Sequence, residues 1–345
     1  MVPPASTLLG RLRQRACADA SHVRVVLAES DDARVLEAAI EAQTREICQP
    51  ILIGEPEAVR TRADGLDLDL PDPVIIVDPA AHERIATWAT EAAAERAERG
   101  LAPAGPDTDP FESWARRPLP FAGLLVRHGE ADAAVLGAVA TTADTLRAAL
   151  RTVGVHPESE LVSSCFLMEL PDGRVLVFAD CGVVPRPTPL QLADIAVQTA
   201  ATCRRLLGEE PRVALLSFST LGSARHADVD RVIEAGDLLA ARAVDFEFAG
   251  ELQADAALVP AVAARKAPES KVAGHANVMI FPDLTSGNIA YKLTERLAGA
   301  RAVGPLLQGL ARPIHDLSRG CSASDIVDAM AIAALDVVRS PRRVA

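Results

Sequence analysis

Short apolar segments alternate with helical segments along the first third of the chain. Residues 23–27, 51–54 and 74–77 are apolar runs rich in Val, Ile and Leu, which is typical of strands buried on both faces. Between the first two runs, acidic residues at 29–32 predict the start of a helix that ends near Thr44. This alternation constrains the fold strongly, because it indicates βαβ units and a mostly parallel sheet.

The same alternation continues to about residue 151. Further helices are predicted over residues 7–18, 58–62, 83–99, 121–127 and 142–151, and a further strand over residues 134–139. Residues 102–110 are the segment richest in Pro, Gly and Asp, which predicts a surface loop.

Near residue 154 the pattern changes. Two predicted strands, residues 161–169 and 174–178, flank Pro171-Asp172-Gly173, which is typical of an antiparallel hairpin. Further strands are predicted over residues 213–217, 244–248 and 278–281, with helices between them. The sequence therefore predicts a second domain with a mixed sheet.

One helix in this second part has a well-defined predicted start and end. Thr188 is suited to cap it, Pro189 to occupy its first position, and Gln191 to close a capping box. We expect this helix to run to Leu207 and to stop at Gly208.

Composition and charge exclude several classes of function. The formal net charge of −12 argues against a nucleic-acid surface, which needs a basic stripe. Six cysteines without a Cys-x-x-Cys pair or a His/Cys cluster argue against a disulfide framework and a structural zinc. No apolar stretch reaches membrane length, and we see no signal peptide. We expect a cytoplasmic protein that binds no metal, membrane or nucleic acid.

Residues 316–325 gather groups that suit an anion. Apolar residues recur at three- and four-residue steps from Ile326 onward, so a helix should begin near Ser322. A helix start presents free N–H groups and the positive end of the dipole. Arg319 lies just before this start and could grip two phosphate oxygens. Asp325, about one turn into the helix, is then a candidate base.

Each of these groups also has a simpler interpretation. Ser322 and Asp325 have the spacing of a capping box, so Asp325 could simply accept a backbone N–H. Arg319 could be a solvated surface charge, and the Ser318 hydroxyl could bond the local backbone of a turn. The spacing alone leaves both interpretations open.

The surroundings of this segment resemble the phosphate acetyltransferase family. Gly304-Pro305-Leu306-Leu307-Gln308-Gly309-Leu310, then Pro313, then residues 316–322, are similar to the C-terminal signature of that family. The stretches that agree with the family in the same order are residues 179–181, 214–220, 250–257, 266–270, 277–284 and 287–292. The resemblance covers nearly the whole chain and is densest from about residue 134 onward.

The resemblance implies a fold and an activity. The fold is an α/β fold with two domains and a cleft between them, like that of isocitrate and isopropylmalate dehydrogenases. Residues 1–153 and 311–345 would form the first domain and residues 154–310 the second. The activity is the reversible transfer of an acetyl group between acetyl phosphate and coenzyme A, by direct attack of the thiolate in a ternary complex. Coenzyme A is then a substrate, no cofactor is tightly bound, and a homodimer is expected.

The resemblance also implies roles for individual residues. Arg319 would bind the phosphate end, Ser318 would contribute to catalysis, and Asp325 would deprotonate the thiol. The substrate-binding residues that it implies are Arg147, Arg96, Thr142, Asn288 and Lys292. For Arg96 and Lys292, a solvated surface charge is the alternative.

Other functions remain open at this point. A phosphate butyryltransferase would share the fold and the anion-binding residues. A non-catalytic regulatory domain of the same type would not need Ser318, Arg319 and Asp325. A dehydrogenase of the related two-domain fold lacks support, since no G-x-G-x-x-G follows a strand. The chain departs from the family where Ala28-Glu29-Ser30 replaces Pro-Glu-Gly, and acyl-chain preference is not determined.

Overall fold

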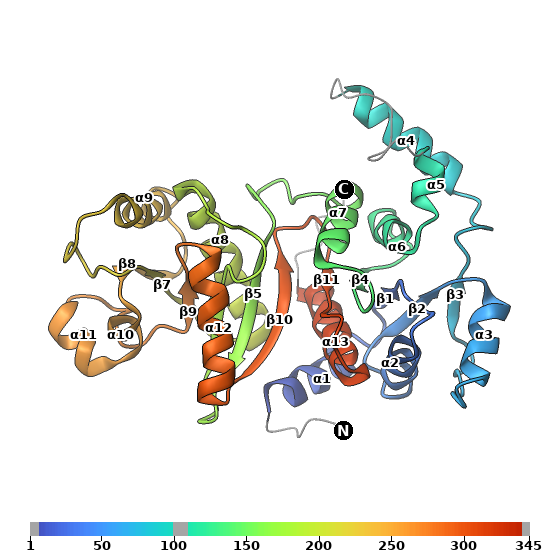
Figure 1. The fold of residues 1–345 in the computed structure, drawn as a ribbon, viewed down its shortest axis with the longest axis horizontal. Coiled ribbons are helices and arrows are strands. Elements are labelled where there is room, and N and C mark those ends of the chain that lie inside the picture. Colours follow the sequence, from blue (N-terminus) through green and yellow to red (C-terminus); the bar gives the residue numbers. More distant parts are fainter. Residues whose placement is uncertain (1–6, 99–109, 340–345) are drawn as a thin grey trace. The chain divides into compact units, whose positions relative to one another are not determined.

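The computed structural model describes residues 7–98 and 110–339, so nearly all of the predicted loop at 102–110 lies outside the described residues. The described residues form two compact units (Figure 1). One unit runs to Gly154 and resumes at Arg312, and the other is Val155–Ala311. Each unit is built on its own sheet with helices packed against it, which confirms the predicted mixed α/β class.

The first unit contains a five-stranded sheet in which every pairing is parallel, with the order β11-β4-β1-β2-β3. Its strands are β1 (Arg24–Leu27), β2 (Gln49–Ile53), β3 (Ile75–Val77), β4 (Ala133–Leu136) and β11 (Ile314–Asp316). From β1 the chain builds outward through β2 and β3, and it then adds β4 and β11 on the other side of β1. The strand order therefore reverses between β1 and β4. Open α/β sheets bind ligands outside the carboxyl ends of the strands at such a reversal.

Two groups of helices pack against this sheet, and they lie on opposite sides of it in Figure 1. One group is α1 (Leu8–Asp19), α2 (Ala33–Thr44) and α13 (Ala323–Arg339), and the other includes α6 (Pro118–Arg127) and α7 (Thr142–Thr152). The remaining helices of the unit are α3 (Pro56–Asp64), α4 (Ile85–Glu98) and α5 (Phe111–Ala115).

A buried ion pair holds α13 in place. Arg13 of α1 donates from Nε to Asp328 Oδ1 at 2.6 Å and from Nη2 to the carbonyl oxygen of Ser324 at 2.7 Å. Arg13 is 5% exposed and Asp328 is 3% exposed, so both charges are buried, and Arg13 Nη1 also pairs with Glu41 Oε1 at 2.9 Å. The first turn of the C-terminal helix is thereby tied to the first helix of the chain.

The second unit contains a six-stranded mixed sheet with the order β10-β5-β6-β9-β7-β8. Strands β5 (Ser163–Glu169) and β6 (Val175–Ala179) form the antiparallel hairpin that the sequence predicts. Strands β6, β9 (Val278–Ile280), β7 (Arg212–Leu216) and β8 (Glu247–Leu252) then pair in parallel, and β10 (Arg301–Gln308) pairs antiparallel with β5.

Helices α8 (Pro189–Thr202) and α9 (Ala227–Ala241) pack together and against the parallel strands, while α12 (Leu284–Ala298) packs against β10, β5 and β6. The short helices α10 (Ala254–Leu258) and α11 (Pro260–Lys266) pack on each other. The capping box of Thr188 and Gln191 is present as predicted. The helix continues through a π-helical turn, Cys203–Leu207, and ends at Gly208, which has φ 69°.

Two predicted strands need corrected bounds, and two strands, β10 and β11, were not predicted. Strand β4 ends at Leu136 instead of residue 139, because Gly137 turns the chain with φ +94°. Strand β8 spans Glu247–Leu252 instead of residues 244–248, since its pairing with β7 begins at Glu247. Strand β10 was not predicted, since Gly304 and Pro305 in its middle indicate a turn. It is an edge strand with a bulge in its pairing between Val303 and Leu306, where a proline is tolerated.

Candidate active site

Three loops of the first unit lie at the carboxyl ends of neighbouring strands. They follow β1 (residues 28–32), β4 (residues 137–141) and β11 (residues 317–322). The pairing of β4 with β11 continues beyond the strands, because Leu317 N donates to Leu136 O at 2.8 Å. The loops that precede α7 and α13 therefore start side by side.

Gly137 and Asp316 meet beneath these loops. A Cβ atom at residue 137 would lie 2.5 Å from Asp316 Oδ1 and 3.1 Å from Thr145 Oγ1, so only glycine fits this approach. Asp316 is 4% exposed, and burial raises the pKa of its carboxyl, while the hydroxyls of Thr142 and Thr145 beside it act in the opposite sense. The start of α7 and the end of β11 thus share one buried polar contact region.

Arg34 of α2 joins two of the loops through their backbone. Its guanidinium is held by Asp32, with Nε to Oδ1 at 2.9 Å and Nη2 to Oδ2 at 2.7 Å. From there Nη1 donates to the carbonyl oxygens of Arg319 at 2.9 Å and Cys321 at 2.7 Å, and Nη2 donates to that of Ala138 at 2.8 Å. The backbone of Arg319 is therefore fixed although its side chain is exposed.

The segment around Ser318 forms a tight turn. Ser318 O accepts from Cys321 N at 2.9 Å, and Ser318 Oγ accepts from Gly320 N at 3.3 Å. The hydroxyl therefore bonds the local backbone, as the simpler interpretation expects, and its own hydrogen can still be donated. Ser318 and Arg319 are both exposed. Within the part of the chain that the structure describes, no ion-pair partner holds the Arg319 guanidinium.

The capping box at the start of α13 is present. Asp325 Oδ2 accepts from Ser322 N and from Ser322 Oγ, each at 2.9 Å, and Asp325 N donates to Ser322 Oγ at 3.2 Å. The helix begins at Ala323, close to the predicted start. Asp325 is exposed, so its capping role does not shield it from solvent or from a substrate. Its role as a base stays a prediction.

Cys321 lies within the same segment but is 8% exposed. Burial raises the pKa of its thiol, with the nearby guanidinium of Arg34 acting against this rise. Because the thiolate is the nucleophilic form of cysteine, Cys321 is poorly suited to form a covalent acyl-enzyme.

The first unit also contains the predicted residues Arg147, Thr142 and Arg96. Thr142 is the first residue of α7, and Thr141 caps that helix. Arg147 is exposed, and its Nη1 lies 2.7 Å from Asp144 Oδ1 one turn earlier. Arg96 lies in α4, but its side chain falls outside what the structure describes.

Asn288 and Lys292 belong to α12 in the second unit. Asn288 Nδ2 donates to Cys181 O at 3.1 Å, so it holds the loop after β6. Lys292 Nζ lies 4.8 Å from the centroid of the Tyr291 ring and is exposed. The structure thus brings Ser318, Arg319, Thr142 and Arg147 onto loops and a helix at one sheet edge, with Asp325 at the start of α13. Asn288 and Lys292, in contrast, lie on the second unit.

Sequence reasoning missed Arg34. It placed Asp316 in the 316–325 segment without a role of its own, and it noted Glu29 only before a helix start and in a departure from the family. No sequence pattern indicated a role for Arg34, because an arginine in an amphipathic helix is usually a solvated charge. Asp316 had a weak signal, since a carboxylate directly after a buried strand lies at the carboxyl edge of the sheet.

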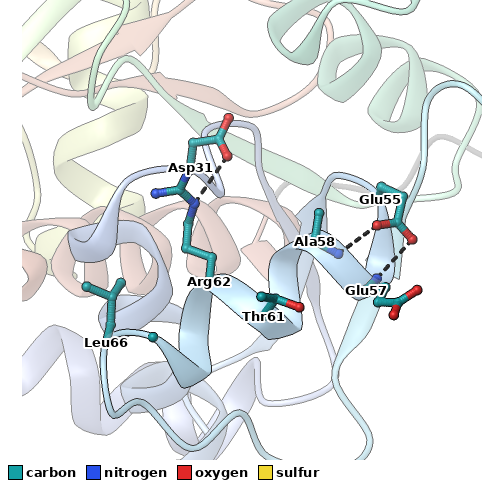
Figure 2. Close-up of a pocket in the computed structure, with 8 residues that line it drawn as sticks. Asp31, Glu55, Glu57, Ala58, Thr61, Arg62 and Leu66 are labelled. Atoms are coloured by element: carbon teal, nitrogen blue, oxygen red, sulfur yellow. Dashed lines mark hydrogen bonds and ion pairs between the residues drawn. The ribbon is translucent and has the colours of Figure 1, made fainter.

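A hollow of about 680 Å³ on the first unit lies between Asp31 of the β1 loop and α3. Figure 2 shows Glu55 and Glu57 at one end of it and Arg62 directed toward Asp31. Three of its lining side chains are carboxylates, which would repel a phosphate.

Among the described residues, no group of three or more His, Cys, Asp or Glu could hold a metal ion. None of the helices in the described ranges is long and apolar enough to cross a bilayer.

The fold and these loops define an α/β protein that presents an exposed arginine and two helix starts at the carboxyl edge of a parallel sheet. The family described as phosphate acetyl/butaryl transferase matches residues 8–334, and the chain belongs to this family of acyltransferases.

Curated relatives and a solved structure agree with this assignment. The phosphate acetyltransferase of Paracoccus denitrificans is 46% identical over 332 residues, which cover 95% of this chain and 98% of the relative. That of Treponema pallidum is 45% identical over 318 residues, which cover 90% of this chain and 93% of the relative. The crystal structure of a phosphotransacetylase from Streptococcus pyogenes is 38% identical, covers 96% of this chain and 98% of its own, and has a TM-score of 0.89.

Proposed function

We propose that the protein is a phosphate acetyltransferase that moves an acetyl group reversibly between acetyl phosphate and coenzyme A. The observation that carries the proposal is the close match of nearly the whole chain to proteins of that name. The exposed Arg319 guanidinium, on a backbone held by Arg34, adds a positioned cation for a phosphate. A regulatory domain without activity would not need to hold that residue in place.

We further propose direct transfer in a ternary complex. The Asp325 carboxylate takes the proton of the coenzyme A thiol, and the sulfur then attacks the carbonyl carbon of acetyl phosphate. The new C–S bond forms as the C–O bond to phosphate breaks, and the phosphate leaves with its charge beside Arg319. The Ser318 hydroxyl can donate its hydrogen to the carbonyl oxygen as negative charge develops there. The buried Cys321 thiol, whose pKa is raised by burial, supports this route over a covalent acyl-enzyme.

Arg147 and Thr142 are proposed to bind substrate from the start of α7, together with Arg96 of α4 and Asn288 and Lys292 of the second unit. The proposed fold is the two-domain fold of isocitrate and isopropylmalate dehydrogenases with a cleft. The two domains would be residues 1–153 with 311–345, and residues 154–310.

The purified protein is expected to release phosphate from acetyl phosphate only when coenzyme A is present, and to form acetyl-CoA in equal amount. The rate should be unchanged by a chelator, because the proposed mechanism uses arginine in place of a metal. Propionyl and butyryl phosphate, assayed in parallel, decide between an acetyltransferase and a butyryltransferase. Chelator inhibition reversed by a divalent ion, or a clear preference for butyryl phosphate, would contradict the proposal.

We also propose a homodimer in a reducing compartment, the cytoplasm. None of the six cysteines, all of which lie in the described residues, forms a disulfide, which supports the compartment. Ile289, Leu293 and Leu297 of α12 are 52%, 51% and 81% exposed, and their spacing of four residues places them on one helix face. An exposed apolar face of this kind supports association. Light scattering is expected to give the mass of two chains, and a single-chain mass at micromolar concentration would contradict the dimer.

A further inference from the structure

We propose that Glu29 is a positioning residue for the transfer reaction. Its carboxylate holds the loop between β4 and α7, and this loop determines where Thr142 and Arg147 meet the substrate. The inference rests on the proposed function and assigns a role to a residue of the β1 loop that the proposed chemistry does not use.

The Glu29 carboxylate accepts hydrogen bonds from four successive backbone N–H groups. Oε2 accepts from Gly137 N at 3.0 Å and from Ala138 N at 2.6 Å. Oε1 accepts from Val139 N at 3.0 Å and from Ala140 N at 2.7 Å. Hydrogen bonds to an ionised acceptor are about twice as strong as neutral ones, so this side chain strongly favours one conformation of the loop.

The loop needs such an acceptor because β4 ends at Leu136 and its next four N–H groups leave the ladder. Gly137 turns the chain with φ +94°, and the N–H groups then converge on one point. Convergent backbone N–H groups form a concavity that binds anions. In this protein the anion at this concavity is the Glu29 carboxylate, so the substrate phosphate must be bound by side chains such as Arg319.

A continuous series of contacts leads from this loop to the proposed substrate-binding residues. Thr141 is the last residue of the loop, and its Oγ1 donates to Asp144 Oδ2 at 2.7 Å and accepts from Asp144 N at 3.2 Å. Asp144 in turn lies 2.7 Å from Arg147 Nη1. On the other side of the loop, Arg34 binds the carbonyl oxygen of Ala138 and that of Arg319. Displacing the loop would therefore move the α7 contacts relative to Arg319.

The test replaces Glu29 with glutamine, which keeps the size but offers one oxygen and turns an NH₂ group toward two backbone donors. We expect kcat/KM to fall roughly tenfold to a hundredfold, mostly through a raised KM, as for a displacement of about 1 Å at a binding group. Amide hydrogen exchange of residues 137–140 should become faster. This second measurement does not depend on activity.

Glu55→Gln is the matched control. Glu55 also accepts two backbone N–H groups, from Glu57 at 3.0 Å and Ala58 at 2.6 Å, but at the start of α3 (Figure 2). The Glu55→Gln variant should leave kcat and KM unchanged while loosening only the start of α3. If Glu29→Gln matches Glu55→Gln in kinetics, or leaves exchange at residues 137–140 unchanged, the inference is wrong.

A rescue experiment separates positioning from general stability. Glu29→Ala leaves the four N–H groups without their acceptor, and sodium formate supplies a small carboxylate that can occupy the site. Formate is expected to lower the KM of Glu29→Ala several-fold. Arg147→Ala, which lacks a substrate-binding group, is the reference variant, and formate should leave its KM unchanged. A formate effect no larger than on the unmodified protein would overturn the inference. An inactive unmodified protein would instead refute the proposed function, while exchange at residues 137–140 would still report on Glu29.

Discussion

Arg319→Ala is expected to lower turnover by about a hundredfold or more, the scale for removing one preorganised group that stabilises developing charge. Arg319→Lys should recover only part of this loss, because lysine offers a point charge where arginine makes a two-point contact with phosphate. The measurement is kcat and KM for acetyl phosphate and coenzyme A in the three proteins. The effect should appear mostly in kcat, since charge moves onto the phosphate as the bond breaks.

The structure makes this experiment easy to interpret. Arg34 holds residue 319 through its carbonyl oxygen, which alanine and lysine both retain. The loop should therefore keep its conformation, and the melting temperature should change little. Arg60→Ala, the loss of an exposed arginine on α3, is the control for charge alone. Equally mild effects of Ala and Lys at residue 319, close to that of Arg60→Ala, would make Arg319 a surface charge.

Asp325→Asn is expected to lose roughly a hundredfold in turnover at neutral pH, because the amide cannot take the thiol proton. The loss should shrink as pH rises toward the free thiol pKa of about 8.5, where coenzyme A supplies its own thiolate. The measurement is a pH–rate profile of both proteins with their melting temperatures.

The capping box makes a competing prediction for the same variant. Asn can still accept from Ser322 N through its amide oxygen, in place of the carboxylate contact at 2.9 Å. If Asp325 is only a cap, the variant should lose about 1 kcal/mol of stability or less and keep its turnover. A protein that melts lower yet turns over normally at neutral pH would mean that the base lies elsewhere. Ser322→Ala, which removes the hydroxyl partner of the cap and no carboxylate, shows the size of the capping effect alone.

Local sequence patterns predicted most elements of the fold. The hairpin around Pro171-Asp172-Gly173, the capped start at Thr188 and the start of α13 near Ser322 were all confirmed. Each depends on contacts within a few residues, so the sequence contains the relevant information directly. The family and its activity class could also be inferred, since residues 316–322 and the other matching stretches occur in a fixed order.

The errors arose where distant segments decide local structure. Strand β10 passes through Gly304 and Pro305, which disfavour a strand locally, because it pairs with β5 more than 130 positions earlier in the chain. Strand β4 stops at Leu136 because Gly137 turns toward Asp316 and Glu29 captures the next four N–H groups. The sequence of residues 134–139 alone does not reveal the contacts with Asp316 and Glu29, so the end of the strand could not be predicted from it.

The sequence by itself determined the α/β class, the family and the segment that contains Ser318, Arg319 and Asp325. Only the tertiary structure decided which residues hold that segment in place. Arg34 binds backbone atoms of residues 319 and 321, 285 and 287 positions away, and Glu29 binds those of residues 137–140, about 110 positions away. Backbone N–H and carbonyl groups are the same in nearly every residue, so a side chain that recognises them leaves no sequence signal at its target. The contacts arise because β1, β4 and β11 are neighbours in one parallel sheet.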